Sequence, residues 1–251
     1  MDTYLRFAEL LLKSRYAVAL TGAGISVESG IPDFRGRDGV WAKYDPWEYG
    51  HIDSFRADPE KVWNMLLEMS ALVEGVSPND AHYALGELEK LGVLKMVITQ
   101  NVDSLHQKGG ACNVVEFHGN FRGMHCDRCL RSYCSTEVSL ASLPPRCACG
   151  GPIRPDVVLF GEGIPEEAYT KAFEAAERCD LMVVVGTSAS VAPASDLPLV
   201  ARGRGARIVE INPEASELPG GYRDLHIREP AGTAFRNIMR VLKSIHTEDG
   251  N

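Results

Sequence analysis

Five short apolar runs, spread over the 251 residues, constrain the fold of this chain more than any other feature. They lack the alternation of apolar and polar residues that marks a half-exposed strand, and such runs are typical of a sheet with helices on both faces. Segments with helical spacing separate most of them, and this order predicts an α/β fold with a doubly wound parallel sheet. The expected strands are Ala17–Leu20, Leu94–Thr99, Val114–Phe117, Leu181–Gly186 and Arg207–Ile211.

The helices expected between these strands follow from apolar spacing and from capping residues. Asn79 is a suitable N-cap for a helix that ends near Gly92. Further helices are predicted over residues 4–13, 166–178 and 232–245.

Two stretches interrupt this order. Residues 37–76 are predicted to be helical with no strand between the helices, and residues 119–156 contain five of the seven cysteines. Both fit insertions that together form a second, smaller lobe. The remaining residues, 1–36, 77–118 and 157–251, then make up the Rossmann-like domain.

Composition limits the kinds of partner. The chain is 45% hydrophobic and 24% charged, which is ordinary for a globular protein, and its formal net charge is −8. This charge argues against binding nucleic acid and fits a basic partner, although it serves equally well to keep the protein dissolved. No apolar run approaches the roughly 18 residues of a membrane span, and the N-terminus does not follow the signal-peptide pattern. We therefore expect no membrane association and a cytoplasmic location, where cysteines are thiols or metal ligands.

A glycine loop follows the first expected strand. Gly22-Ala23-Gly24 is half of a dinucleotide-binding fingerprint, although Val27 stands where the third glycine is usual. Such a loop also occurs as a simple tight turn. The continuation GIPDFRG, residues 30–36, adds an acid, an aromatic ring and a guanidinium to a loop that Pro32 stiffens. A turn in a core has no need of that combination.

The cysteines between residues 119 and 156 form two close pairs. Cys126 and Cys129 are followed, after seventeen residues, by Cys147 and Cys149. Four thiolates close the coordination tetrahedron of one Zn²⁺, so this spacing predicts a structural zinc ribbon with no open position for catalysis. Cys134 lies between the pairs as a competing ligand. Cys112 and Cys179 are expected to be ordinary buried or half-buried thiols.

Small polar residues follow four of the expected strands. Ligands of open α/β sheets lie beyond the carboxyl ends of the strands, so these residues are candidates for one binding cleft. His118 has the residue type of a general base, although a lone histidine at a strand end is more often structural. Asn101 or Asp103 alternatively caps a helix, and His51 and His82 are expected to be structural. The candidates are Gln100, Asn101, Asp103, His118, Gly186, Thr187, Ser188 and Asn212.

Taken in order, these motifs resemble those of the sirtuins, a family of NAD-dependent protein deacylases. The resemblance extends from about Leu11 to the last expected helix, and the displaced third glycine is itself the pattern of that family. It rests on the paired cysteines and on the segments GAGIS (22–26), GIPDFRG (30–36), TQNVDSLH (99–106), FHG (117–119), VVLFGE (157–162), VVGTS (184–188) and EIN (210–212).

The resemblance implies a role for each group of residues. His118 would be the general base and Asn101 would order a water, so both are expected in catalysis. NAD would be the co-substrate, bound by Gly22, Ala23, Gly24, Ser26, Pro32, Asp33, Phe34, Arg35, Gln100, Asn101, Asp103, Gly186, Thr187, Ser188 and Asn212. An acyl-lysine peptide would add as a strand to Val157, Val158, Leu159, Phe160, Gly161 and Glu162. The products would be free lysine, nicotinamide and an O-acyl-ADP-ribose.

One pair of residues bears on the acyl group. Family members specialised for succinyl- or malonyl-lysine carry a tyrosine and, three residues later, an arginine that bind the acyl carboxylate. Leu66 and Met69 occupy those places here. Because an unpaired carboxylate is costly to bury, we expect a preference for acetyl or longer neutral acyl groups.

Two other functions remain open. The same pocket fits a protein ADP-ribosyltransferase, and it also fits a regulatory protein that binds NAD or ADP-ribose without converting it. A nucleic-acid-binding zinc module is disfavoured, because Arg128, Arg131 and Arg146 are the only basic residues between the first and last paired cysteines. The sequence leaves the oligomeric state open.

Overall fold

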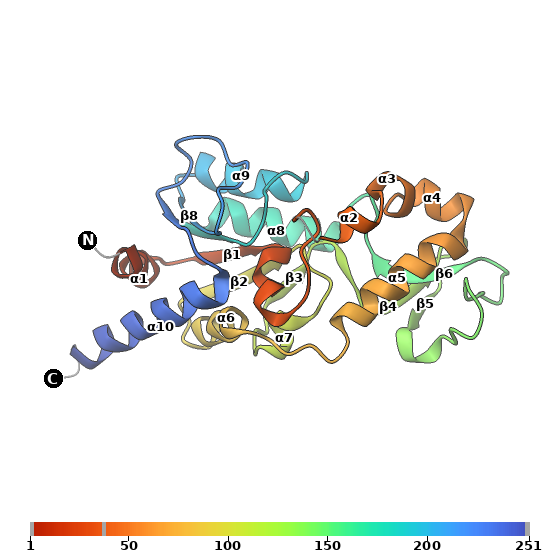
Figure 1. The fold of residues 1–251 in the computed structure, drawn as a ribbon. Coiled ribbons are helices and arrows are strands. Elements are labelled where there is room, and N and C mark those ends of the chain that lie inside the picture. The colour runs from red at the N-terminus through yellow and green to blue at the C-terminus, as the bar shows by residue number, and fades with distance from the viewer. Residues whose placement is uncertain (1–2, 37–38, 249–251) are drawn as a thin grey trace.

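The computed structural model describes residues 3–36 and 39–248, so the first residues of the expected 37–76 insert and both chain ends lie outside the described residues. Figure 1 shows two lobes side by side, with α1 (Thr3–Lys13) and α10 (Ala231–Glu248) at the end of the large lobe farthest from the small one. No helix in the described part of the chain is long and apolar enough to cross a membrane.

The large lobe contains a parallel sheet of six strands in the order β3-β2-β1-β7-β8-β9. The chain moves outward from β1 in one direction and from β7 in the other, so the switch point lies between these two strands. The strands are β1 (Ala17–Thr21), β2 (Leu94–Thr99), β3 (Val114–Glu116), β7 (Leu181–Val185), β8 (Arg207–Ile211) and β9 (Leu225–Ile227). The five expected strands are confirmed to within one residue at each end, and β9 is an addition.

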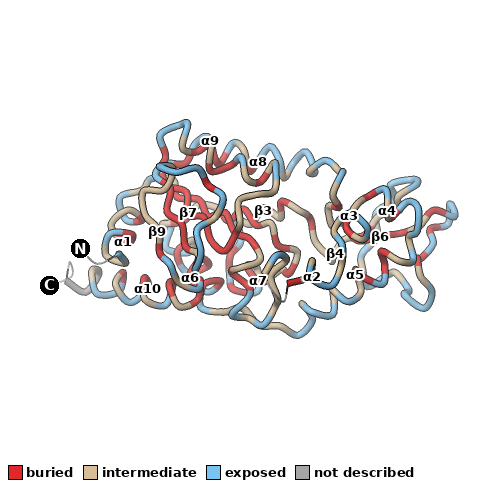
Figure 2. Tube along the Cα trace, turned by 45° about the horizontal axis from the view of Figure 1, so that its top comes forward, coloured by how far each residue is buried: buried red, intermediate tan, exposed pale blue. Residues whose placement is uncertain are grey.

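Helices cover both faces of this sheet, as the unalternating strands predict. Ala17 and Ala19 of β1 point to the face covered by α1, α6 (Asp80–Lys90) and α10, whereas Val18 and Leu20 point to the opposite face. That second face is covered by α8 (Glu166–Arg178) and α9 (Leu197–Gly203). Figure 2 accordingly shows buried residues concentrated along the strands of the large lobe. Asn79 caps α6 as expected, since its side chain accepts a hydrogen bond from Ala81 N.

The two insertions pack together into the small lobe. Trp63 of α5 is buried and donates from its indole nitrogen to Ile153 O of β6, at 2.8 Å. This contact joins the helical insert to the three-stranded antiparallel sheet β5-β4-β6. The elements are α2 (Val40–Lys43), α3 (Pro46–Tyr49), α4 (Ile52–Ala57), α5 (Pro59–Val73), β4 (Gly119–Cys126), β5 (Ser132–Cys134), the 3₁₀-helix η2 (Ser135–Glu137) and β6 (Ile153–Val157).

Candidate active site

The loop after β1 lies directly against the loop after β7. A Cβ atom on Gly22 would lie 2.7 Å from Cβ of Thr187, and one on Gly24 would lie 2.7 Å from Cα of Gly186. Gly24 N donates to Gly186 O at 2.8 Å. Since φ of Gly22 is −129°, an ordinary value, these two loop glycines are required by close approach of the two backbones. The backbones of the two loops are therefore in direct contact at the switch point of the sheet.

The segment after the loop is a 3₁₀-helix, η1 (Ala23–Ser29), where a dinucleotide-binding fold usually has an α-helix. It ends at Gly30, whose φ is +94°. In the following loop, the Asp33 carboxylate accepts a hydrogen bond from Gly36 N, and the Phe34 ring lies 5.3 Å from that of Trp41. Asp33 therefore fixes a turn, while Phe34 and Pro32 line the adjoining cavity.

A buried hydrogen-bond network joins η1 to the end of β2. Ser26 Oγ donates to Asp103 Oδ2 at 2.7 Å, and Asn101 Nδ2 lies 3.1 Å from Gly22 O and 3.3 Å from Ser26 Oγ. Asp103 also accepts from Leu105 N at 2.8 Å, at the start of α7 (Leu105–Lys108), so its carboxylate shapes the chain and faces the cavity. Among the described residues no donor reaches Asn101 Oδ1, which leaves this oxygen as an acceptor for a ligand or a water.

The other strand ends are joined in the same way. Gln100 Nε2 donates to Thr187 Oγ1 at 2.9 Å, and Asn212 Nδ2 donates to Thr187 O at 3.1 Å. Arg35 reaches Ser188 Oγ at 3.4 Å. Hydrogen bonds therefore join the polar residues that follow β1, β2, β7 and β8 along one edge of the sheet.

His118 lies at the junction of the two lobes. Its Nδ1 is 3.1 Å from Gln100 O, and Val158 N donates to His118 O at 2.9 Å. The next residue, Gly119, has φ of +77°, and a Cβ there would lie 1.7 Å from Asp156 O. The chain can therefore turn from β3 into β4 at this point only with glycine. Burial lowers the pKa of His118 below its usual 6.5, although the contact with Gln100 O opposes this shift.

Two further histidines lie beneath the cleft. His82 Nε2 is 3.5 Å from Ser26 Oγ, and its ring centroid is 5.0 Å from that of His106, whose Nε2 is 2.8 Å from Thr21 Oγ1. Burial lowers the pKa of His82 to about 4 and that of His106 to about 3, so both rings are neutral near pH 7. His82 also accepts from Asn79 N, which supports the expected structural role. The contact of His82 with Ser26 was not predicted from the sequence. The three-residue spacing of Asn79 and His82, which is that of a capping box, could have placed His82 at the start of α6.

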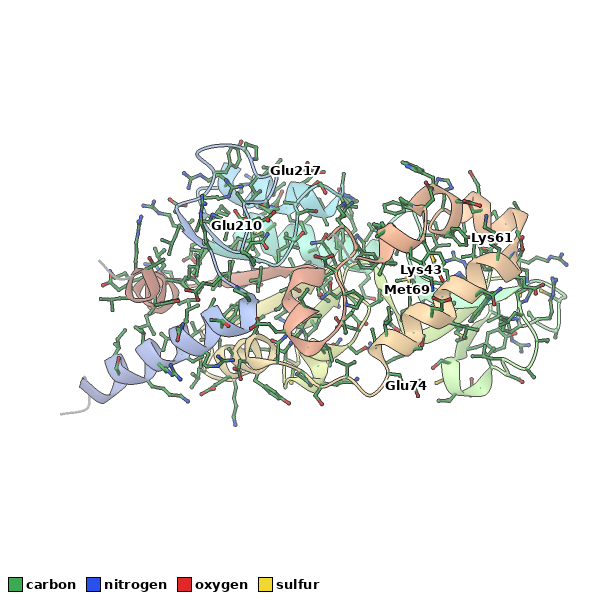
Figure 3. All side chains as sticks on the ribbon, viewed as in Figure 1. Lys43, Lys61, Met69, Glu74, Glu210 and Glu217 are labelled. Carbon is green, nitrogen blue, oxygen red and sulfur yellow. The ribbon has the colours of Figure 1, made fainter. Side chains whose placement is uncertain are left out.

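An apolar cavity adjoins the network. Met69, Leu72 and Val73, which share one face of α5, line it together with Phe34 and Phe121, and Ser26, Asn101 and Asp103 form its polar end. Figure 3 shows Met69 on α5 beside Lys43 of α2. Lys43 is paired with Glu68. Leu66, one turn earlier on the helix, is buried in the core of the small lobe with Phe55 and Trp63.

The segment from Val157 to Glu162 crosses between the lobes. Phe160 N donates to Gly50 O at 2.8 Å and Phe160 O accepts from Ile52 N at 3.0 Å, which tie the segment to the helical insert. Leu159 is buried, and its N–H donates to Glu162 Oε2 at 2.9 Å. Glu162 also pairs with the buried Arg154. Glu162 therefore shapes the turn, whereas no donor among the described residues reaches the carbonyl oxygen of Val158.

The paired cysteines meet at the outer end of the small lobe. The sulfur atoms of Cys126, Cys129, Cys147 and Cys149 lie within 4.8 Å of one another, with two separations of 3.5 and 3.6 Å. A tetrahedral zinc with bonds of about 2.3 Å holds its sulfurs about 3.8 Å apart, so the four thiols fit this metal. The eight residues of β4, at about 3.3 Å each, carry Cys126 up to about 26 Å away from His118, so the metal is structural.

The other three cysteines lie outside this cluster. Cys134 Sγ contacts Thr136 Oγ1 at 3.2 Å and is no ligand of the cluster. Burial raises the pKa of Cys179 to about 12, as for an ordinary core thiol. Cys112 is exposed, so the expectation of burial was wrong there, because it lies in the connection between α7 and β3.

The fold and the site define a class of protein: a Rossmann-like domain with a zinc-ribbon lobe, and a cavity lined by residues of both. The sequence model of the Sir2 family matches residues 22–193. The chain belongs to this family.

The chain is also similar to individual proteins along most of its length. It is 46% identical over 245 residues to an NAD-dependent protein deacetylase of Saccharolobus solfataricus, covering 96% of this chain and 97% of the relative. It is 43% identical over 239 residues to NAD-dependent protein deacylase 1 of Archaeoglobus fulgidus, covering 95% and 97%. A solved Sir2 complex with a p53 peptide and NAD⁺ superimposes with a TM-score of 0.87 at 36% identity, covering 96% of this chain and 98% of the other.

Proposed function

We propose that this chain is an NAD-dependent protein-lysine deacylase. The placement of His118 carries the proposal: a half-buried imidazole, whose pKa lies below 6.5, stands beside the end of β2 and the segment 157–162. A protein that only bound NAD would need no base there. The names of the relatives, and a solved structure of a family member with a p53 peptide and NAD⁺, support the same activity.

The residues around the site have different roles in the proposed reaction. When bound, NAD supplies a ribose carbon that can release nicotinamide and ribose hydroxyls that can receive the acyl group. Because Gln100 O can only accept a hydrogen bond, the His118 proton resides on Nδ1, and Nε2 is free to take a proton from a ribose hydroxyl. Asn101 Oδ1 is placed to order a water or to hold the carboxamide. Phe34, at the edge of the cavity, excludes water from the reacting carbon.

The remaining cofactor contacts follow from the polar cleft. The nicotinamide half lies against Ala23, Ser26, Pro32 and Asp103, and the adenosine half against Thr187, Ser188 and Asn212. The glycines of the two loops leave the backbone open to the pyrophosphate.

The peptide binds across the segment 157–162. The carbonyl oxygen of Val158 is an acceptor for a peptide N–H, beside His118, and the acyl-lysine enters the apolar cavity from there. We propose basic substrate proteins, since the chain carries a net charge of −8. A cytoplasmic location is part of the proposal, and it is compatible with seven cysteines of which none forms a disulfide.

The cavity favours neutral acyl groups. Among the described residues that line it, none is lysine or arginine, and Asp103 would repel a carboxylate at the polar end. Met69, Leu72 and Val73 offer apolar surface to an acetyl or longer chain. Succinyl- and malonyl-lysine are therefore expected to be poor substrates.

A mass-spectrometric assay with NAD tests the proposal. Matched peptides carrying acetyl-, myristoyl- or succinyl-lysine are compared, with His118→Ala as control. We expect free lysine peptide, nicotinamide and O-acyl-ADP-ribose in equal amounts from the two neutral peptides. Transfer of ADP-ribose to protein without deacylation would favour the transferase, and NAD binding without turnover would favour a regulatory protein.

A further inference from the structure

Trp47 is the most exposed aromatic side chain in the described part of the chain, with 71% of its surface accessible. A tryptophan ring in this position leaves a large apolar face in water, and aromatic rings of this kind are enriched where proteins bind one another. The ring lies beside Phe160, with centroids 6.1 Å apart and planes inclined by 33°. Since Phe160 belongs to the proposed peptide-binding segment, Trp47 extends that surface outward.

The backbone holds Trp47 in a fixed place. Asp45 caps α3 by accepting from Trp47 N at 2.8 Å, and Pro46 occupies the first position of this helix. Trp47 O accepts from Ser54 Oγ at 2.9 Å, which joins α3 to α4. A ring carried on such a turn loses little conformational freedom when it binds a partner.

Two acidic residues near Trp47 in the chain, Asp45 and Asp53, lack a lysine or arginine partner in the described part of the protein. The three lysines and arginines of residues 43–61 all form ion pairs with other acids: Lys43 with Glu68, Lys61 with Glu48 and Arg56 with Asp127. Asp45 and Asp53 have no lysine or arginine within ion-pair distance among the described residues. The Asp53 side chain is 79% exposed and lies 3.6 Å from Nδ1 of His51, whose ring lies 5.9 Å from that of Trp47. The exposed indole therefore lies near two carboxylates that have no partner among the described lysines and arginines: Asp45 caps the helix that carries the ring, and Asp53 adjoins His51, which lies beside the ring.

We propose that Trp47, with Asp45 and Asp53, binds a lysine or arginine side chain of the substrate, close in sequence to the acyl-lysine. The cation stacks on the indole face, and the two carboxylates add electrostatic attraction. This inference rests on the proposed deacylase function and deepens it, because it names which substrate residues the enzyme selects. Trp47 acts on specificity and takes no part in the chemistry.

Steady-state kinetics with three acetyl-lysine peptides test this proposal. The residues flanking the acetyl-lysine are arginine in the first peptide, citrulline in the second and norleucine in the third. Citrulline keeps the shape of arginine without its charge. For the wild-type protein we expect the arginine peptide to have a KM roughly two- to fivefold below that of the citrulline peptide.

The variants separate the ring from the carboxylates. Trp47→Ala and Trp47→Leu should raise the KM of the arginine peptide to the citrulline value, Trp47→Phe should retain part of the preference, and Asp53→Asn should reduce it. Asp45→Asn removes the second charge and keeps a capping side chain. The KM of NAD and the kcat should not change. Leu91→Ala, which removes an exposed apolar side chain of the large lobe, is the control and should behave as wild type.

Four results would overturn the proposal. Three are kinetic: equal KM values for the arginine and citrulline peptides, an equal loss for both on Trp47→Ala, or a preference for norleucine. The fourth is a dimer in sedimentation that Trp47→Ala dissociates, which would assign the ring to a second copy of the chain. If no acetyl-lysine peptide is deacetylated, the deacylase function itself fails. The two failures are thus distinguishable.

Discussion

The Nδ1 atom of His118 lies 3.1 Å from the backbone carbonyl oxygen of Gln100. This contact joins the ring to the residue that follows β2, and the backbone of His118 continues directly into Gly119, where β4 of the small lobe begins. The ring of the proposed base is thus oriented by a carbonyl group at the end of a sheet strand, while its backbone leads into the other lobe.

Replacing His118 by alanine should lower kcat roughly 10²- to 10⁴-fold, because a positioned general base is lost. The melting temperature and the affinity for NAD should stay near wild type, which calorimetry and thermal denaturation measure. Burial holds the pKa of His118 below 6.5, so the ring stays neutral into mildly acidic solution. Activity should therefore fall with decreasing pH only when the pH passes below this lowered pKa. An alanine variant that deacylates at the wild-type rate would remove His118 from the mechanism.

Loss of the metal should unfold the small lobe. Cys147→Ser breaks the four-thiol cluster, so we expect zinc content to fall, the melting temperature to decrease and activity to be lost indirectly. Elemental analysis and circular dichroism check this. Cys134→Ser is the matched control, since Cys134 lies outside the cluster, and it should keep both zinc and stability.

The buried histidines predict a dependence of stability on pH. Their pKa values are about 4 for His82 and about 3 for His106 in the folded state, against 6.5 unfolded. The unfolded chain therefore binds more protons below pH 6.5, and stability falls as the pH decreases. Between pH 7 and 5 each ring should cost roughly 2 kcal/mol of unfolding free energy.

Urea denaturation at pH 7, 6 and 5 measures this loss, to which His118 adds in the same direction. The variant His106→Asn should lose less stability over this range than the wild type, because one of the rings is gone. Asp180 and Asp224 have lowered pKa values and respond only at more acidic pH. An unfolding free energy that stays constant from pH 7 to 5 would show that the rings take up protons inside the fold.

Met69 should govern the choice of acyl group. Met69→Arg places a cation in the apolar cavity, so kcat/KM for acetyl-lysine should fall at least tenfold while succinyl-lysine gains activity. Met69→Leu keeps an apolar side chain of similar size and should behave nearly as wild type. Efficient removal of succinyl groups by the unaltered protein would contradict this assignment.

Glu210 should support the adenosine end of the cleft. Its carboxylate is fully buried, pairs with Arg223 and accepts from Ser216 N, and it lies two residues before Asn212. Figure 3 shows Glu210 and Glu217 in this part of the large lobe. Glu210→Gln should cost about 3 kcal/mol of stability and raise the KM of NAD. The exposed pair of Glu167 and Lys171 gives the control, since Glu167→Gln should change stability by less than about 1 kcal/mol.

The strands of the large sheet and the zinc cluster could be predicted from the sequence because each depends on a short window. The unbroken run Leu94–Thr99 indicates a strand buried on both faces. Two close cysteine pairs indicate a zinc ribbon whatever the orientation of the two pairs relative to each other. The polar residues at the strand ends were also predictable, since parallel strands bring their carboxyl ends to one edge.

Other features depended on packing between distant segments, and only the tertiary structure decided them. Leu66 and Met69 lie on one face of α5, yet one is covered by Phe55 and Trp63 while the other faces the cavity. The contact of His82 with His106, and that of Trp47 with Phe160, join residues far apart in the chain. Local spacing determines which face a side chain occupies. How deeply that face is buried, and what it meets there, is set by the segments that fold against it.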